Sequence, residues 1–253
     1  MWEQVKIEKR MADAVSWLQE QVRAAHMRGL ICGLSGGVDS SVAAGLCRRA
    51  FPENAAAVIM PCHSAPEDRA DALLAAEYLD LNVIEIDLTA TFDTLISSLN
   101  SYLPQSPAVR RLITGNAKAR LRMTTLYALA ASNAYLVVGS DNAAENYTGY
   151  FTKYGDGGAD ILPIKSLTKT EVRLWGKALG LPPRLTERTP TAGLWPGQTD
   201  EEELGFGYDL IDRYLLGFDI EKTTAERIEY LHRTSEHKRR EPAALELPNP
   251  FRN

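Results

Sequence analysis

Short, largely apolar runs alternate with longer amphipathic stretches along most of this chain. The runs are Gly29–Leu34, Ala55–Met60, Asn82–Leu88 and Tyr135–Gly139. Runs of this length, bounded by glycine, proline or polar residues, are typical of strands that are buried in a parallel sheet. They therefore predict four strands.

The stretches between and after these runs predict helices, because apolar residues recur in them at helical spacing. The predicted helices cover residues 8–27, 38–50, 67–80, 89–102, 112–133, 168–179, 200–216 and 223–235. In the first helix Met11, Leu18 and Val22 share one face, which can pack on the sheet or on a second subunit. At the start of the sixth, Thr168 and Glu171 match a capping box.

Strands that alternate with helices at this spacing predict an α/β fold with a doubly wound parallel sheet flanked by helices. Ligands of such sheets bind outside the carboxyl ends of the strands. We find no linker or internal repeat, and we expect a single domain over residues 1–253. The segment 140–165, rich in glycine and aromatic residues, is predicted to be a long loop, and long loops are often functional.

Composition narrows the class of protein. The chain has 253 residues, 45% of them hydrophobic, and a formal net charge of −5, which disfavours a nucleic-acid partner. No apolar stretch approaches the ~20 residues that a membrane-spanning helix needs, and no signal-peptide core opens the chain. Cys32, Cys47 and Cys62 are widely spaced and fit reduced core thiols in a cytoplasmic protein.

The most informative string is Ser35–Ser41, which reads Ser-Gly-Gly-Val-Asp-Ser-Ser and follows the first predicted strand. Two adjacent glycines let the backbone take positive φ, and the exposed N–H groups of the turn and the following helix can bind an anion. Asp39 would repel a phosphate unless a cation lies between them. The string therefore predicts a pyrophosphate cradle with a Mg²⁺ ligand, the alternative being an ordinary capped turn.

A second string, Gly115–Met123, is basic. On a helix Asn116 and Arg120 share one face, and Lys118 and Arg122 share another. Apolar neighbours predict that the helix is largely buried; they are Leu112, Ile113, Leu121, Met123, Leu126 and Leu129. Arginines in a buried helix need anionic partners, and a substrate carboxylate or phosphate would suit. The alternative is a solvated basic face.

A third string, Gly139–Glu145, places Asp141 and Glu145 just after the fourth predicted strand, at the sheet edge where Asp39 also lies. Carboxylates from separate loops can share Mg²⁺, which binds few protein oxygens together with phosphates and water. The alternative is a pair of surface acids in a loop.

Together these strings resemble the ammonia-dependent NAD synthetases, a branch of the ATP pyrophosphatases with an adenine-nucleotide α-hydrolase fold. The resemblance extends to further strings in the same order. These are Gly149–Leu162, Lys169-Thr170-Glu171, Pro190–Leu204 and His237-Lys238. Because the matches span residues 33–238, they are far more specific than any one motif.

The resemblance implies a role for residues from most of these strings. The implied ATP-binding residues are Gly33, Leu34, Ser35, Gly36, Gly37, Val38, Asp39, Ser40, Ser140, Lys169 and Thr191. The implied substrate-binding residues are Arg120, Lys153, Asp160, His237 and Lys238. Asp39 and Glu145 would hold Mg²⁺. Lys169 would neutralise phosphate charge, and Asp160 would orient ammonia or accept its proton.

The implied reaction amidates deamido-NAD (nicotinate adenine dinucleotide) to NAD. Attack of the nicotinate carboxylate on the α-phosphate of ATP would give an acyl-adenylate and pyrophosphate, and ammonia would then displace AMP. Catalysis of this kind needs positioning and charge neutralisation rather than a nucleophilic side chain. The first predicted strand begins so early that we expect no glutaminase domain, and free ammonia or a partner protein would supply the nitrogen.

Alternatives remain open from the sequence. Many relatives carry histidine where this chain has Asn142, and Tyr147 adds bulk nearby. If Tyr147, Tyr150 or the short C-terminal tail closes the pocket, the substrate would be nicotinate mononucleotide. A tRNA-modifying or GMP-forming ATP pyrophosphatase and a non-enzymatic nucleotide sensor are the rival classes.

The resemblance also implies a homodimer, with residues 8–27 and 112–133 as interface elements.

Overall fold

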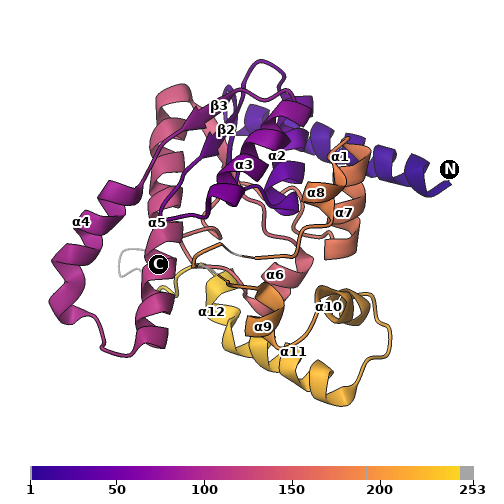
Figure 1. Ribbon diagram of the computed structural model, residues 1–253. Coiled ribbons are helices and arrows are strands. Elements are labelled where there is room, and N and C mark those ends of the chain that lie inside the picture. Colours follow the sequence, from indigo (N-terminus) through magenta and orange to yellow (C-terminus); the bar gives the residue numbers. More distant parts are fainter. Residues whose placement is uncertain (1, 192, 196, 246–253) are drawn as a thin grey trace, which may run out of the picture.

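A parallel sheet forms the centre of the computed structural model (Figure 1), which describes residues 2–191, 193–195 and 197–245. Its strands are β1 Gly29–Gly33, β2 Ala55–Ile59, β3 Val83–Glu85 and β4 Tyr135–Val138, in the order β3-β2-β1-β4. Leu30 of β1 pairs with Ala55 on one side and Leu136 on the other. The predicted parallel α/β fold is confirmed.

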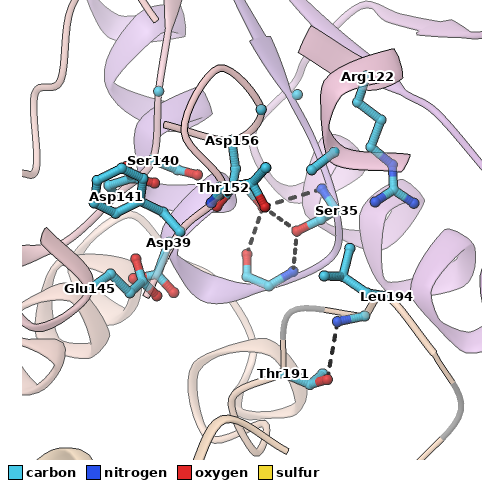
Figure 2. Close-up of a pocket in the computed structure, with 18 of the residues that line it drawn as sticks. Ser35, Asp39, Arg122, Ser140, Asp141, Glu145, Thr152, Asp156, Thr191 and Leu194 are labelled. Atoms are coloured by element: carbon cyan, nitrogen blue, oxygen red, sulfur yellow. Dashed lines mark hydrogen bonds between the residues drawn. The ribbon is translucent and has the colours of Figure 1, made fainter. Parts of the chain in front are cut away.

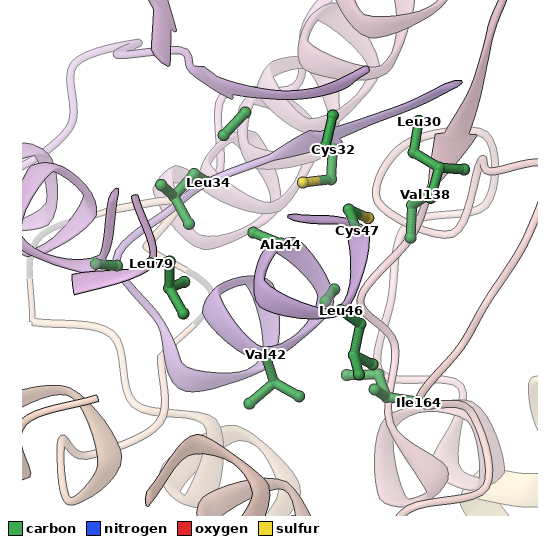
Figure 3. Packing of buried hydrophobic residues seen from close by; sticks show 14 of the residues in the cluster. Leu30, Cys32, Leu34, Val42, Ala44, Leu46, Cys47, Leu79, Val138 and Ile164 are labelled. Carbon is green, nitrogen blue, oxygen red and sulfur yellow. The ribbon is translucent and has the colours of Figure 1, made fainter. Parts of the chain in front are cut away.

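Alternating residues of β1 point to opposite faces of the sheet, and each face has its own helices. Leu30 and Cys32 face a core that α1 Trp2–Ala24, α2 Val38–Ala50, α3 Pro66–Tyr78 and α7 Lys169–Ala178 complete. Figure 3 shows the part of this core around α2. Ile31 faces a second core with α4 Thr89–Leu99 and α5 Pro107–Asn133. Because strands such as β1 are buried on both faces of the sheet, their sequences are continuously apolar.

Short helices from the C-terminal part of the chain pack into a satellite core beside the sheet. They are α6 Ala143–Thr148, α9 Asp200–Leu204, α10 Tyr208–Leu215 and α11 Lys222–Thr234. The buried residues of this satellite core are Ala144, Leu204, Phe206, Tyr208, Ile211 and Ile228. Helix α8 Pro183–Thr186 contacts α7 and adds Leu185 to the first core, and α12 Glu236–Arg239 follows α11. In Figure 1 the helices of the satellite core lie below the sheet.

The first helix packs within this chain. Met11, Leu18 and Val22 are buried, and α1 contacts α2 and α7. The predicted packing of this helix on the body of the subunit is therefore confirmed, and its role as an interface element stays a prediction. The described helices include none that is long and apolar enough to cross a membrane, and all three cysteines are free and buried.

The third strand is shorter than predicted. The apolar pattern predicts a strand over residues 82–88, but β3 covers Val83–Glu85. It lies at the edge of the sheet and pairs only with β2. Ile84 and Glu85 are exposed, and burial on one side alone accounts for the alternation of apolar and acidic residues in this run.

Two other predictions were wrong in detail. The predicted loop 140–165 contains α6, whose six residues are too short to show helical periodicity. The predicted helix 200–216 is broken, because Gly205 has a φ of +89° and separates α9 from α10. A positive φ at glycine is a common way to end a helix.

Helix α5 is longer than predicted and less buried. It begins at Pro107, a residue well suited to the first turn of a helix. Leu112 and Ile113 are 56% and 36% exposed, so the prediction of a largely buried helix fails for its first half. Figure 1 shows that this half projects with α4 beyond the sheet.

Candidate active site

A cavity of about 620 Å³ lies at the carboxyl ends of β1, β2 and β4. It is lined by the turn after β1, the loop after β4, one side of α5 and the described residues between 188 and 200. Strands β1 and β4 are neighbours in the sheet, and the cavity lies at their carboxyl edge, which is where open α/β sheets bind ligands. Asp200, the first residue of α9, brings the satellite core to this wall as well.

The turn Ser35–Ser41 is held by its own serines. Ser40 Oγ accepts a hydrogen bond from Ser35 N at 3.2 Å and donates to Gly37 O at 3.0 Å. Ser41 Oγ donates to the same carbonyl at 2.8 Å. Gly36 has a φ of +86°, and Figure 2 shows hydrogen bonds around Ser35. The serines thus fix the turn, and the N-terminal amides of α2 open into the cavity.

Three charged side chains meet beside this turn. Lys169 Nζ lies 2.5 Å from Asp39 Oδ2 and 3.7 Å from Glu145 Oε1. The three side chains are 4%, 15% and 17% exposed respectively. Their positions come from the start of α2, the first turn of α6 and the first residue of α7. Figure 2 shows the two carboxylates side by side in the cavity wall.

The pKa values reflect this crowding. Burial, together with the Asp39 carboxylate, raises the pKa of Glu145 to about 8. Burial opposes the charge on Lys169, but Asp39 and Glu145 outweigh it and raise the pKa of that ammonium above its ordinary value. The pKa of the Asp200 carboxyl is also raised by burial. The site thus holds more negative charge than one lysine can neutralise.

The donor set fits Mg²⁺. Two carboxylate oxygens converge on one point, and in this structure the Lys169 ammonium occupies it. The described residues contain no group of three or more His, Cys, Asp or Glu side chains that could hold a metal ion alone. Mg²⁺ commonly binds one or two carboxylates and takes its other ligands from substrate phosphates and water. Asp39 and Glu145 would serve as that pair.

Satellite-core residues hold this cluster in place. Tyr208 OH donates to Asp200 Oδ2 at 2.9 Å and to Glu145 Oε1 at 3.3 Å. The carboxylate of Asp212 in α10 accepts from Lys169 N at 3.0 Å and from Thr170 N at 2.8 Å, which caps the N-terminus of α7. The predicted capping box of Thr168 and Glu171 is confirmed beside it.

The structure brings the predicted ATP-binding residues together. Those that line the cavity are Gly33, Leu34, Ser35, Gly37, Val38, Asp39, Ser40, Ser140, Lys169 and Thr191. Gly36 does not line it but packs against α3. Ala192 and Pro196, which belong to the string Pro190–Leu204, lie outside the described residues.

The predicted substrate-binding residues divide into two groups. Lys238 lines the main cavity and donates to Gly149 O and Phe151 O at 2.8 Å. Arg120 is exposed, and its guanidinium donates to Lys153 O. Lys153 Nζ in turn donates to His237 O. These contacts tie the C-terminal helix to the segment after α6.

Asp160 lies outside the main cavity as well. Its Oδ2 accepts from Val137 N at 2.8 Å, and its Oδ1 accepts from Tyr127 OH at 3.1 Å. Tyr127 and Tyr154 border a second hollow of about 450 Å³ on the outer side of residues 154–159. Asp160 lines neither hollow, whereas Met123 and Gly158 line both.

Of the charged residues of the main cavity, sequence reasoning missed Asp156, whereas Asp141 and Arg122 lie in strings that it had singled out without an assigned role. Asp141 and Asp156 both line it, and burial raises the pKa of each carboxyl. Arg122 also lines it, donating to Met60 O and Ser64 Oγ at 3.1 Å. Asp156 stands between glycines within the string Gly149–Leu162, and this setting is the signal that could have found it.

Comparison with known proteins agrees with this geometry. A sequence model of the family described as NAD synthase matches residues 10–242. An NH(3)-dependent NAD(+) synthetase of Alkaliphilus oremlandii is 50% identical over 245 residues, which are 95% of this chain and 98% of the relative. The resemblance inferred from the motifs is confirmed.

Solved structures agree as well. An NMN synthetase from Francisella tularensis has a TM-score of 0.87 at 39% identity, covering 97% of this chain and 99% of that one. An NH3-dependent NAD synthetase from Campylobacter jejuni has a TM-score of 0.77 at 29% identity, covering 95% and 99%. With sequence, fold and cavity in agreement, this chain belongs to the NAD synthase family.

Proposed function

We propose that this chain uses ATP and ammonia to amidate the nicotinate carboxylate of deamido-NAD, giving NAD, AMP and pyrophosphate. The observation that carries the proposal is the cluster beside the Ser35–Ser41 turn. An anion-binding turn, a buried ammonium and two converging carboxylates lie within one cavity. Family membership supplies the substrate class, and the cavity supplies the means to activate a carboxylate with ATP.

In the first step, a carboxylate oxygen of the substrate attacks the α-phosphorus of ATP. The bond from that phosphorus to the bridging oxygen breaks, pyrophosphate leaves, and an acyl-adenylate forms. The turn amides and the Lys169 ammonium would hold the departing phosphates, with Thr191 on the opposite wall. Mg²⁺ bound by Asp39 and Glu145 would neutralise charge on those phosphates.

In the second step, ammonia attacks the carbonyl carbon, the bond to AMP breaks, and the nitrogen loses a proton. A carboxylate near this point can orient ammonia or take the proton. Asp160 is the residue that the sequence predicts for this role, and that assignment stays a prediction. Asp156 is a second candidate, because it lines the main cavity and burial raises its pKa toward values that suit a base.

We expect Asp156→Asn to slow amide formation more than pyrophosphate release, because only the second step needs the base. Rapid-quench measurement of both products in one reaction checks this. Asp160→Asn is the matched variant, and it should leave the ratio of the two products unchanged if Asp156 is the base, because the Asp160 carboxylate contacts Val137 N and Tyr127 outside the main cavity. Selective slowing in Asp160→Asn, with Asp156→Asn unaffected, would return the role to Asp160.

The substrate is proposed to be the dinucleotide, although one structural relative is named an NMN synthetase. Tyr147 does not line the cavity, and its OH donates to Glu229 of α11 at 2.9 Å. Tyr150 lines the cavity, with its OH donating to Glu203 at 2.5 Å. Of the two tyrosines, Tyr147 is thus directed away from the space that an adenylate group would need.

One assay tests the proposal and its alternatives. The protein is incubated with ATP, Mg²⁺ and ammonium, with deamido-NAD or nicotinate mononucleotide in parallel reactions, and AMP, pyrophosphate and amide are measured. We expect stoichiometric AMP and amide with deamido-NAD. Preference for the mononucleotide would support the alternative substrate, whereas ATP binding without any amide product would reject the enzyme class.

We also propose that the chain forms a homodimer through α4 and the first half of α5. This projection exposes a run of apolar side chains: Leu99, Tyr102, Val109, Leu112 and Ile113. Contiguous apolar patches of this kind often mark subunit interfaces. The second hollow lies farther along the same helix, at Met123 and Tyr127.

Leu112→Asp is expected to shift the protein from dimer to monomer, because it places a charge on an apolar interface. Light scattering after size-exclusion chromatography measures the mass. Leu216→Asp is the control, since Leu216 follows α10 and is similarly exposed at 61%. A monomeric mass for the unmodified chain would contradict the proposal.

A further inference from the structure

Asn142 lies between the two proposed metal carboxylates and is fully buried. Its side-chain Nδ2 donates to Asp39 Oδ1 at 2.8 Å. Its backbone N–H donates to Glu145 Oε2 at 3.0 Å, and its Oδ1 accepts from Glu145 N at 3.1 Å. A single asparagine therefore contacts both carboxylates through separate atoms.

These contacts leave the other oxygen of each carboxylate directed at a common point. Asp39 Oδ2 and Glu145 Oε1 lie 2.5 and 3.7 Å from the same ammonium nitrogen, that of Lys169. Rotation of either carboxylate would break its bond to Asn142. The free oxygens are thus held in place before a metal or a nucleotide binds.

The amide also suits this position electrostatically. Two carboxylates close together in a buried site repel each other, and the amide gives Asp39 a hydrogen bond without placing a second cation where the metal would bind. Partners that orient metal-bound carboxylates typically change metal affinity by about 10–100-fold when they are lost.

We propose that Asn142 is a positioning residue for the Mg²⁺ of the Mg²⁺–ATP complex. Through its side chain it orients Asp39, and through the capping box it orients Glu145. The inference rests on the proposed function only for the identity of the cation. The proposal gives Asn142 a role beyond capping α6. A variant that keeps the cap but loses the contact with Asp39 can therefore test it.

Asn142→Ser separates the two tasks. Serine is a good N-cap residue and can still accept from Glu145 N, but its shorter side chain does not reach Asp39. Asn142→Ala removes both side-chain contacts, the one to Asp39 and the one from Glu145 N. Asn146→Ser is the matched control, because it makes the same exchange in α6 at a side chain with no described hydrogen bond.

The measurement is Mn²⁺ binding by electron paramagnetic resonance, with a non-hydrolysable ATP analogue present, alongside thermal melting and analogue binding without metal. We expect Asn142→Ser to weaken Mn²⁺ binding by about 10–100-fold, with melting temperature and metal-free nucleotide affinity close to those of Asn146→Ser. Asn142→Ala should lose as much Mn²⁺ affinity and also melt earlier.

Two results would overturn the inference. Wild-type Mn²⁺ affinity in Asn142→Ser would show that the contact with Asp39 does not position a metal ligand. Equal losses of metal binding, metal-free nucleotide binding and melting temperature would show a structural role alone. Neither outcome depends on which substrate the enzyme amidates, so failure here is distinguishable from failure of the proposed reaction.

Discussion

Lys169→Met is expected to slow pyrophosphate release by about 10²–10³-fold and, at the same time, to let the nucleotide-free protein bind Mn²⁺ more tightly. The reason is the position of the ammonium, 2.5 Å from Asp39 Oδ2 and 3.7 Å from Glu145 Oε1. In the free protein it occupies the point where a metal would bind. With nucleotide bound, the proposed role of the same lysine is to hold phosphate, and loss of such a group costs about 10²–10³-fold in rate.

The two effects have separate readouts. Pre-steady-state pyrophosphate release measures the loss of rate, and isothermal titration with Mn²⁺ alone measures the gain in metal affinity. Removing one partner of a buried ion pair typically destabilises by about 3–5 kcal/mol, so the variant should also melt earlier and recover when Mn²⁺ is added. Unchanged Mn²⁺ affinity would contradict the exchange of lysine for metal.

Gly36→Ala is expected to destabilise the protein and to prevent ATP binding. A Cβ at this position would lie 2.7 Å from Asp68 O, 2.8 Å from Asp71 Cβ and 2.9 Å from Ala72 N, and the residue has a φ of +86°. The close contacts include backbone atoms of α3, which cannot move freely. Left-handed strain and overpacking together cost about 2–5 kcal/mol.

Gly180→Ala is the matched control for this change. Gly180 has a φ of +87°, but a Cβ added there would have no atom of the described residues within 4 Å, so this variant reports the strain without the overpacking. Urea unfolding of both variants gives the two free energies, and calorimetric titration gives ATP affinity. Equal stability of the two variants, with ATP affinity intact in Gly36→Ala, would show that α3 does not constrain the turn.

The sequence predicts those features that depend on local pattern. The apolar runs locate the strands, and Thr168 with Glu171 locates the start of α7. The turn Ser35–Ser41 is recognisable because glycine pairs and hydroxyl side chains have few other uses after a strand. Asp39 and Glu145 can be paired because both follow parallel strands of one sheet.

Features that depend on tertiary contact cannot be read in the same way. Nothing in the sequence indicates that Lys169 lies between two carboxylates, because the residues come from three distant elements. The sequence analysis predicts a role for Asp160 and does not single out Asp156. Which of these two acids lines the cavity depends on the path of the glycine-rich segment, and that path is set by tertiary contacts. The exposure of Leu112 depends on where α5 leaves the body of the subunit.

Binding of Mg²⁺ would also connect the first core with the satellite core. Asp39 belongs to the central sheet and its helices, whereas Glu145 begins a helix that packs with Tyr208 and Ile211. A ligand that binds both parts of a protein at once stabilises their association by the free energy of its binding. Mg²⁺–ATP would therefore act as a cross-link between the two cores, and its departure after each turnover would remove that added stabilisation.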